Sequence, residues 1–174
     1  MSRNESQSGA LSSVSCSQAL EATVFALRSI AEGVPHEESL PLQSLISSDF
    51  LSALPPQPRL RQTSLAMIGE FAEWLGHNTP SQLPALQFVM NAFSDPRLSW
   101  AAATSLFKIC DTCRAALLPI APDLVAVVGT LSAQNRLGRE DFLKVVKSVA
   151  SVLQALPPAD ANVHIMVRLY ERFY

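Results

Sequence analysis

The sequence predicts an all-α protein built as an α-α superhelix, in which antiparallel helix pairs stack side by side. Apolar residues recur every three or four positions along most of the chain, which is the spacing of a helix buried on one side. Alternating apolar and polar runs are scarce, and the Asn-Gly and Asp-Gly turns typical of hairpins are missing. Proline or glycine stands between the helical segments, and joints this short make neighbouring helices antiparallel.

Two of these helix pairs are related by a repeat of 38 residues. The tripeptide Pro58-Arg59-Leu60 recurs as Pro96-Arg97-Leu98, and apolar residues of the following helices keep the same offset. The matched residues are Leu65 and Ala103, Ile68 and Leu106, and Ala72 and Cys110. Self-similarity near ~40 residues with two helices per unit is typical of a HEAT/ARM-type solenoid, and the chain has room for about four such pairs. One pair cannot bury its apolar side alone, whereas stacked pairs share a continuous core.

The helical period divides the chain into segments whose ends carry recognisable signals. Gly33 ends the first helix, the PPQP run at 55–58 ends the second, and Gly76 ends the third. Thr79 and Pro80 are the predicted N-cap and first-turn pair of the fourth. The predicted helices are residues 18–33, 42–54, 60–76, 79–94, 97–114, 121–133, 139–156 and from about 161 to the end of the sequence.

One continuous array is predicted for residues 17–174, after a disordered, serine-rich lead-in at 1–16. Its repeats are predicted at about 17–56, 57–95, 96–135 and 136–174. Charged residues make up 16% of the chain, against roughly 25% in a typical globular protein, while apolar residues make up 48%. This surplus is expected of a piece of a longer array, whose end faces are covered by further repeats.

The charge balance indicates no direct nucleic-acid partner, because the net charge is −2. Residues 1–87 carry eight acids and four bases, and residues 88–174 carry seven acids and nine bases, so the halves stand at −4 and +2. The most apolar stretch, Ala115 to Leu131, contains Asp123 and two prolines, which argues against a membrane span. The N-terminus lacks the apolar core of a secretion signal, and three cysteines without such a signal indicate reduced thiols in a cytoplasmic or nuclear protein.

Cys110 and Cys113 form a C-x2-C pair, which raises the question of a metal or redox site. A structural zinc site needs four ligands, and the sequence has neither a second pair nor paired histidines. Core packing is therefore the favoured interpretation of both thiols, and no metal or cofactor is predicted. Catalytic motifs are missing too, with no glycine-rich phosphate loop, HExxH or GxSxG, so the chain is predicted not to be an enzyme.

Four segments in colinear order carry patterns beyond the bare helical period. They are ALEATVFALRSIAEG at 19–33, LRQTSLAMIGEFAEWL at 60–75, AAATSLFKICDTCR at 101–114 and REDFLKVVKSVASVLQALP at 139–157. These segments resemble repeats of the importin-β superfamily of nuclear transport receptors, in the branch of transportin-SR (transportin 3) and importin 13, with transportin-SR the closer. The motif positions include Arg61, Ile68, Cys110, Cys113 and Arg114.

The resemblance implies a receptor that carries protein cargo through nuclear pores under control of the GTPase Ran and shuttles between cytoplasm and nucleus. In the transportin-SR branch the cargo bears arginine-serine-rich domains. Full-length members hold many more repeats, so this chain resembles a central segment, with Ran and nucleoporins contacted through the complete receptor. From the residues alone, the alternative is a generic HEAT-repeat scaffold that binds proteins without any dependence on Ran.

Glu70, Glu73 and Trp74 in the third predicted helix are candidate partner-binding residues, because aromatic side chains often anchor interfaces. The alternative is a solvated face for the two acids and packing between repeats for Trp74, and packing is favoured for Trp74. Trp100, at the start of a later helix, fits either a surface or a core position.

A basic cluster of Arg136, Arg139, Lys144 and Lys147 is the second candidate binding site. Lys144 and Lys147 lie one helical turn apart, and acidic or phosphorylated partners suit such a cluster. Glu140 and Asp141 stand among these bases, so the more common explanation is a solvated helix start.

Overall fold

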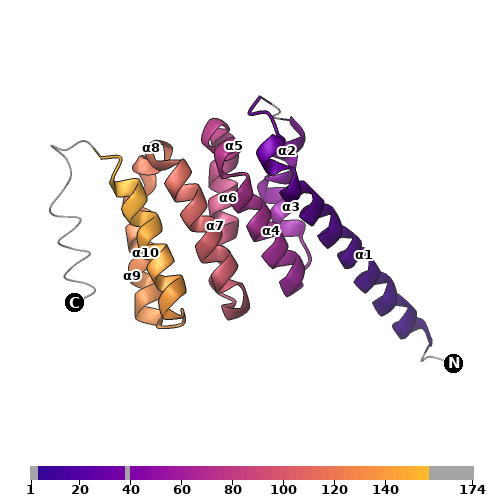
Figure 1. The fold of residues 1–174 in the computed structure, drawn as a ribbon. Helices are drawn as coiled ribbons and strands as arrows, with labels where there is room; N and C mark the ends of the chain where they lie inside the picture. The colour runs from indigo at the N-terminus through magenta and orange to yellow at the C-terminus, as the bar shows by residue number, and fades with distance from the viewer. Residues whose placement is uncertain (1–3, 38–39, 157–174) are drawn as a thin grey trace.

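The computed structural model describes residues 4–37 and 40–156, with side chains from residue 16 onward. This part of the chain consists of helices and their connections and contains no strand. The helices stand in a row, so that each contacts mainly its neighbours along the row (Figure 1). The predicted all-α helical-repeat fold is confirmed.

Four helices form the first layer of the row and pack in the order of the chain: α1 (Asn4–Ser29), α4 (Pro58–Glu70), α7 (Ser99–Thr112) and α10 (Arg139–Leu153). A second layer contains α2 (Leu40–Leu45), α3 (Ser48–Ala53), α6 (Thr79–Ala92) and α9 (Ala121–Gln134). In this layer α6 packs against α4 and α7, α9 packs against α10, and α3 packs against α2 and α6. The shorter elements α5 (Ala72–His77), α8 (Arg114–Leu117), η1 (Ala31–Gly33), η2 (Pro96–Leu98) and η3 (Leu118–Ile120) connect the layers.

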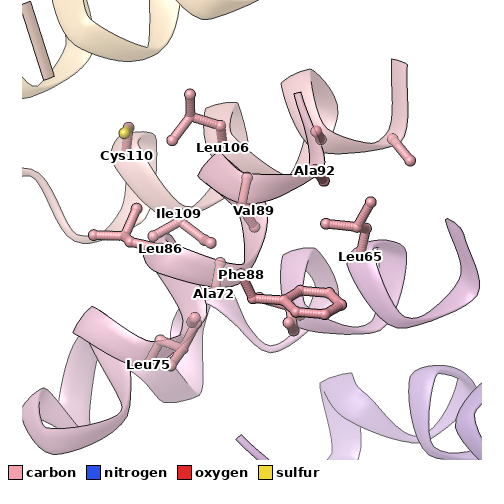
Figure 2. Close-up of a cluster of buried hydrophobic side chains, with 14 of the residues drawn as sticks. Leu65, Ala72, Leu75, Leu86, Phe88, Val89, Ala92, Leu106, Ile109 and Cys110 are labelled. Atoms are coloured by element: carbon pink, nitrogen blue, oxygen red, sulfur yellow. The ribbon is translucent and has the colours of Figure 1, made fainter. Parts of the chain in front are cut away.

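The core between successive pairs follows the repeat seen in the sequence. Leu60, Leu65, Ile68 and Ala72 are buried, and so are the residues 38 positions later. Those later residues are Leu98, Ala103, Leu106 and Cys110. Figure 2 shows side chains from α4 to α7 meeting in one cluster, among them Leu65, Leu86, Val89, Leu106 and Cys110. Adjacent pairs therefore share their apolar sides, as the physics of a stacked array requires.

Hydrogen bonds between residues 40 positions apart connect the first-layer helices. Ser105 Oγ donates to the Leu65 carbonyl at 2.6 Å, and Ser151 Oγ donates to Asp111 Oδ1 at 3.1 Å. The α4 and α7 backbones approach closely at Gly69, where an added Cβ would lie 3.2 Å from Ser105 Cα. A side chain at position 69 would push these helices apart, so the missing side chain permits the observed packing.

Three predicted helices are interrupted in the structure, at residues that neither proline nor glycine marks. The predicted helix 42–54 is divided into α2 and α3, because Ser47 takes an extended conformation and its hydroxyl accepts a hydrogen bond from the Phe50 N–H at 3.2 Å. The predicted helix 60–76 is interrupted at Phe71, between α4 and α5. In the predicted helix 97–114 the first two residues belong to η2, and α7 ends before Cys113.

Two further boundaries differ from the prediction. Asn78, not Thr79, is the N-cap residue of α6, and no side chain caps that helix. Residues 4–16, which were predicted as a disordered lead-in, have helical backbone. They form the first part of α1, which continues without interruption to Ser29 and packs on α4. Figure 1 shows this end of α1 extending beyond the other helices. The predicted helix from about 161 lies outside the described residues, and the division into four repeats remains a prediction.

Within the described part of the chain, one segment is long and apolar enough to cross a membrane by length and composition alone. It is Arg114–Gln134, with a mean hydropathy of 1.7 and 33% of its most apolar window buried. In the structure this segment comprises α8, η3 and α9, and α9 packs against α10. A single such segment is weak evidence for a membrane span, since a core helix passes the same test.

Candidate protein-interaction surface

Glu70 lies at the end of α4 and connects three successive helices of the first layer. One carboxylate oxygen accepts a hydrogen bond from Arg28 of α1 at 3.2 Å, and the other forms an ion pair with Lys108 of α7. The Glu70 side chain is 26% exposed, and the two cations are each 40% exposed. The hydrogen bond from Lys108 is the main cause that holds the pKa of Glu70 below its usual value of 4.5.

Replacing Glu70 by glutamine is expected to lower the free energy of unfolding by roughly 1 kcal/mol at neutral pH, because partly exposed ion pairs contribute little each. The depressed pKa means that the native carboxylate stabilises the fold above pH 4.5, and that this contribution is lost as the pH falls through the lower folded value. Glu70→Gln should therefore lose less stability than the native chain on acidification. Urea unfolding at neutral pH and below pH 4.5 measures both effects.

Glu73 offers the matched control for Glu70. It is exposed and has no ion pair among the described residues, so Glu73→Gln should leave stability and its pH dependence unchanged. Equal effects of the two substitutions would show that the three-helix connection through Glu70 contributes nothing.

Trp74 does not lie on the surface. It belongs to α5, and only 2% of the residue is exposed, so a partner cannot reach it without rearrangement of the fold. The structure agrees with packing between repeats, which the sequence favoured for this residue. The apolar spacing around Trp74 was the available signal, since the buried Phe71 stands three positions before it, about one helical turn, and the buried Leu75 directly follows it.

The basic cluster lies in the loop before α10 and along that helix as far as Lys147. Arg136, Arg139 and Lys147 are exposed, and none has an ion pair among the described residues. Lys144 is half-buried; its ammonium donates to Thr104 Oγ1 of α7 at 3.1 Å and lies 5.1 Å from the centre of the Trp100 ring. The structure thus leaves three bases free for an anionic partner and directs the fourth towards a tryptophan.

Trp100 is a surface residue whose position the sequence left open. It stands in the first turn of α7 and is 62% exposed. Leu143, in the second turn of α10, is 47% exposed, and the sequence analysis did not consider it as a site residue. The helical spacing could have indicated that both residues are exposed, because each falls outside the positions that are buried in its helix.

The remaining motif residues have structural contacts. Arg61 donates to the Leu54 carbonyl at 2.6 Å and lies over the Phe88 ring, so it fixes the turn before α4. Ile68 is fully buried. Arg114 forms an ion pair with Asp111 and donates to Gln154 Oε1 at 3.4 Å.

Cys110 and Cys113 are buried free thiols at the end of α7. Burial raises the pKa of Cys110 to about 12 and that of Cys113 to about 11. The Cys113 thiol donates to the Ala72 carbonyl at 3.6 Å, which joins the ends of two neighbouring repeats. Across the described residues, no group of three or more His, Cys, Asp or Glu is placed to hold a metal ion.

The three thiols are expected to react with maleimide at very different rates. Cys16 is exposed on α1, whereas Cys110 and Cys113 are buried and remain protonated at pH 8, and the thiolate is the reactive form. Mass spectrometry of the labelled native chain should find one fast site, at Cys16, and labelling in denaturant should find all three. Fast labelling of Cys110 in the native chain would contradict the packing described above.

The fold and surface define a helical-repeat protein with connected first-layer helices and an exposed patch of basic and apolar residues. Residues 54–127 match a family model described as the Transportin-3/Importin-13 third TPR domain. The chain is 27% identical to Importin-13 of Rattus norvegicus and of Homo sapiens over 158 residues, which is 88% of this chain and 16% of each relative. It is 24% identical to the mRNA transport regulator MTR10 of Saccharomyces cerevisiae over 153 residues, covering 84% of this chain and 15% of that protein.

The chain is thus similar to part of proteins named as importins and as an mRNA transport regulator, and these similarities do not separate the transportin-SR branch from the importin 13 branch. The chain spans about a sixth of the length of these relatives, at 15–16%. The prediction that it is not an enzyme agrees with their description as importins and a transport regulator.

Proposed function

We propose that this chain is part of a nuclear transport receptor and helps to bind protein cargo for import into the nucleus under Ran control. The observation that carries the proposal is the colinear similarity of 88% of the chain to Importin-13, together with the family model that spans the matched repeats from residue 54 to 127. The chain contributes binding surface, and the complete receptor shuttles between cytoplasm and nucleus.

The finer part of the proposal concerns cargo and branch. We place the chain in the transportin-SR branch, with arginine-serine-rich, phosphorylated splicing-factor proteins as cargo, on the resemblance of residues 60–75 and 101–114 to repeats of that branch. Exposed Arg136, Arg139 and Lys147 support a role in contacting phosphate groups, since guanidinium and ammonium groups form strong charge-assisted hydrogen bonds with phosphate. Ran and nucleoporins are partners of the complete receptor.

The mechanism rests on bending of the stack. Each first-layer helix contacts its neighbours, so small rotations between pairs add up along an array. Glu70 bridges α1, α4 and α7 through charged hydrogen bonds that lie near the surface and can lengthen without opening the apolar core. Such a connection allows two partners to influence one another through the curvature of the array.

The test is cargo binding by the complete receptor that contains this segment. An arginine-serine-rich domain, phosphorylated or not, is titrated with the receptor in the presence of Ran loaded with GTP or, as the control, with GDP. The proposal predicts that GTP-loaded Ran changes the affinity for cargo and that GDP-loaded Ran does not. Cargo binding that is indifferent to both forms would favour the alternative, a HEAT-repeat scaffold without Ran dependence.

A further inference from the structure

The outward position occupied by Trp100 does not need an apolar side chain for packing. Counting back 38 residues, the same position in α4 is Gln62, which is exposed and donates to the Arg97 carbonyl at 2.8 Å. The helix pair therefore packs with a polar residue at this position. A tryptophan that is 62% exposed in the next helix costs hydrophobic free energy that the fold does not require.

The neighbouring helix α10 also carries an exposed apolar residue, Leu143. Ala102, Ser105, Leu106 and Ile109 of α7 are buried, and the residues 43 positions later are buried as well. Those later residues are Val145, Ser148, Val149 and Val152. The same offset relates Trp100 to Leu143, which is 47% exposed and lies outside these buried positions. Two neighbouring first-layer helices therefore present a large exposed apolar side chain, and the hydrogen bonds between residues 40 positions apart put Leu143 three residues further along its helix than the level of Trp100.

Lys144 holds Trp100 in place from the neighbouring helix. Its ammonium lies 5.1 Å from the centre of the indole ring and 3.1 Å from Thr104 Oγ1, so a cation-π contact that is itself anchored by a hydrogen bond favours this position of the ring. An aromatic side chain that is ordered before binding loses little entropy on binding, which is the property of an interface anchor.

The charges around the apolar pair have one predominant sign. Arg139, Leu143 and Lys147 follow one another at intervals of four residues on α10, so they form one exposed stripe with the leucine between two cations. Residues 136–147 carry four bases and two acids, a net charge of +2, whereas the chain as a whole stands at −2. The stripe attracts carboxylates, and its centre accepts an apolar side chain.

We propose that Trp100, Leu143, Arg139, Lys144 and Lys147, named here the α7–α10 patch, bind an acidic protein segment that carries large apolar side chains. Carboxylates of the segment pair with Arg139 and Lys147, and an apolar side chain lies between Trp100 and Leu143. The inference shares with the proposed function only the premise that the chain binds proteins. Arg139 and Lys147 serve both proposals, but this one needs neither Ran nor a phosphorylated arginine-serine-rich domain, so either proposal can fail alone.

Three synthetic peptides without tryptophan test the proposal: one with Asp and Glu around Leu and Phe, one with Asn and Gln in place of the acids, and one acidic peptide with Ala in place of Leu and Phe. Fluorescence anisotropy of the labelled peptides measures their affinity for the chain. Affinity for the first peptide should exceed that for each of the other two by about tenfold. Raising the salt concentration should weaken only the binding of acidic peptides.

Variants locate the binding site. Trp100→Ala and the double variant Arg139→Gln/Lys147→Gln should each weaken binding of the first peptide by about tenfold. Leu83→Ala is the matched control, because Leu83 is 56% exposed on α6 in the second layer, and it should leave the affinity unchanged. No saturable binding of the first peptide, or equal binding by the native chain and Trp100→Ala, would overturn the proposal.

Acrylamide quenching gives a readout that needs no variant. Trp74 is buried and Trp100 is exposed, so quenching of the native chain reports mainly on Trp100. The first peptide should lower the quenching constant and shift the emission to shorter wavelength. Binding of that peptide with unchanged quenching would place it elsewhere and would reject the α7–α10 patch.

Discussion

Replacing Trp74 by alanine is expected to lower the free energy of unfolding by about 3–5 kcal/mol, the range found when large aromatic core residues are truncated. Trp74 is 2% exposed and is among the largest fully buried side chains of the chain, in a core that also contains Phe71 and Leu75. Truncation removes apolar surface from the core and leaves a cavity that the surrounding helices fill only in part. Chemical denaturation followed by far-ultraviolet circular dichroism measures the loss.

The chain contains its own control for this substitution. Trp100→Ala removes the same side chain from a position that is 62% exposed, and it should change stability by no more than about 0.5 kcal/mol. If Trp74→Ala prevents folding altogether, Trp74→Phe gives a graded measure of the same site. Similar losses for Trp74→Ala and Trp100→Ala would contradict the assignment of one tryptophan to the core and the other to the surface.

Replacing Gly69 by valine is expected to cost about 1–3 kcal/mol, the usual cost of overpacking a core. A Cβ at this position would lie 3.1 Å from Ser105 Oγ and 3.2 Å from Ser105 Cα, and the second of these atoms is backbone that cannot rotate away. The substitution therefore forces α4 and α7 apart and strains the hydrogen bond from Ser105 to the Leu65 carbonyl. Thermal unfolding of the variant tests the close approach of successive repeats.

Gly33→Val is the matched control for Gly69→Val. A Cβ at Gly33 would meet no atom within 4 Å, so the same substitution should change stability by about 0.5 kcal/mol or less. A Gly69→Val variant as stable as Gly33→Val would contradict the helix spacing described here.

The repeat and its core could be predicted from the sequence because they depend on periodic burial. Leu65, Ile68 and Ala72 of α4 and their counterparts 38 residues later are all buried, and the apolar period reports burial directly. The helix interruptions could not be predicted in this way. Ser47 and Phe71 interrupt helices where no proline or glycine stands, and the capping hydroxyl of Ser47 competes with continued helix only in its folded surroundings.

The candidate site was predictable as a basic cluster, but its relation to an aromatic side chain was not. Lys144 and Trp100 are 44 residues apart, and only the packing of α7 against α10 brings the ammonium over the ring. The same reason applies to Glu70, whose sequence neighbours say nothing of Arg28 or Lys108. Contacts between repeats depend on side-chain reach across two helices, which a linear period does not contain.

Zero-length cross-linking tests the stacking of successive pairs most directly. A carbodiimide joins an amine to a carboxylate only when the two groups are in contact, and Lys108, Lys144 and Lys147 are the lysines available. Stacked repeats predict an isopeptide bond between Glu70 and Lys108, residues 38 positions apart on α4 and α7, detected by mass spectrometry of the digested monomer. If Lys108 is instead joined only to carboxylates elsewhere in the chain, and never to Glu70, the proposed order of helices is wrong.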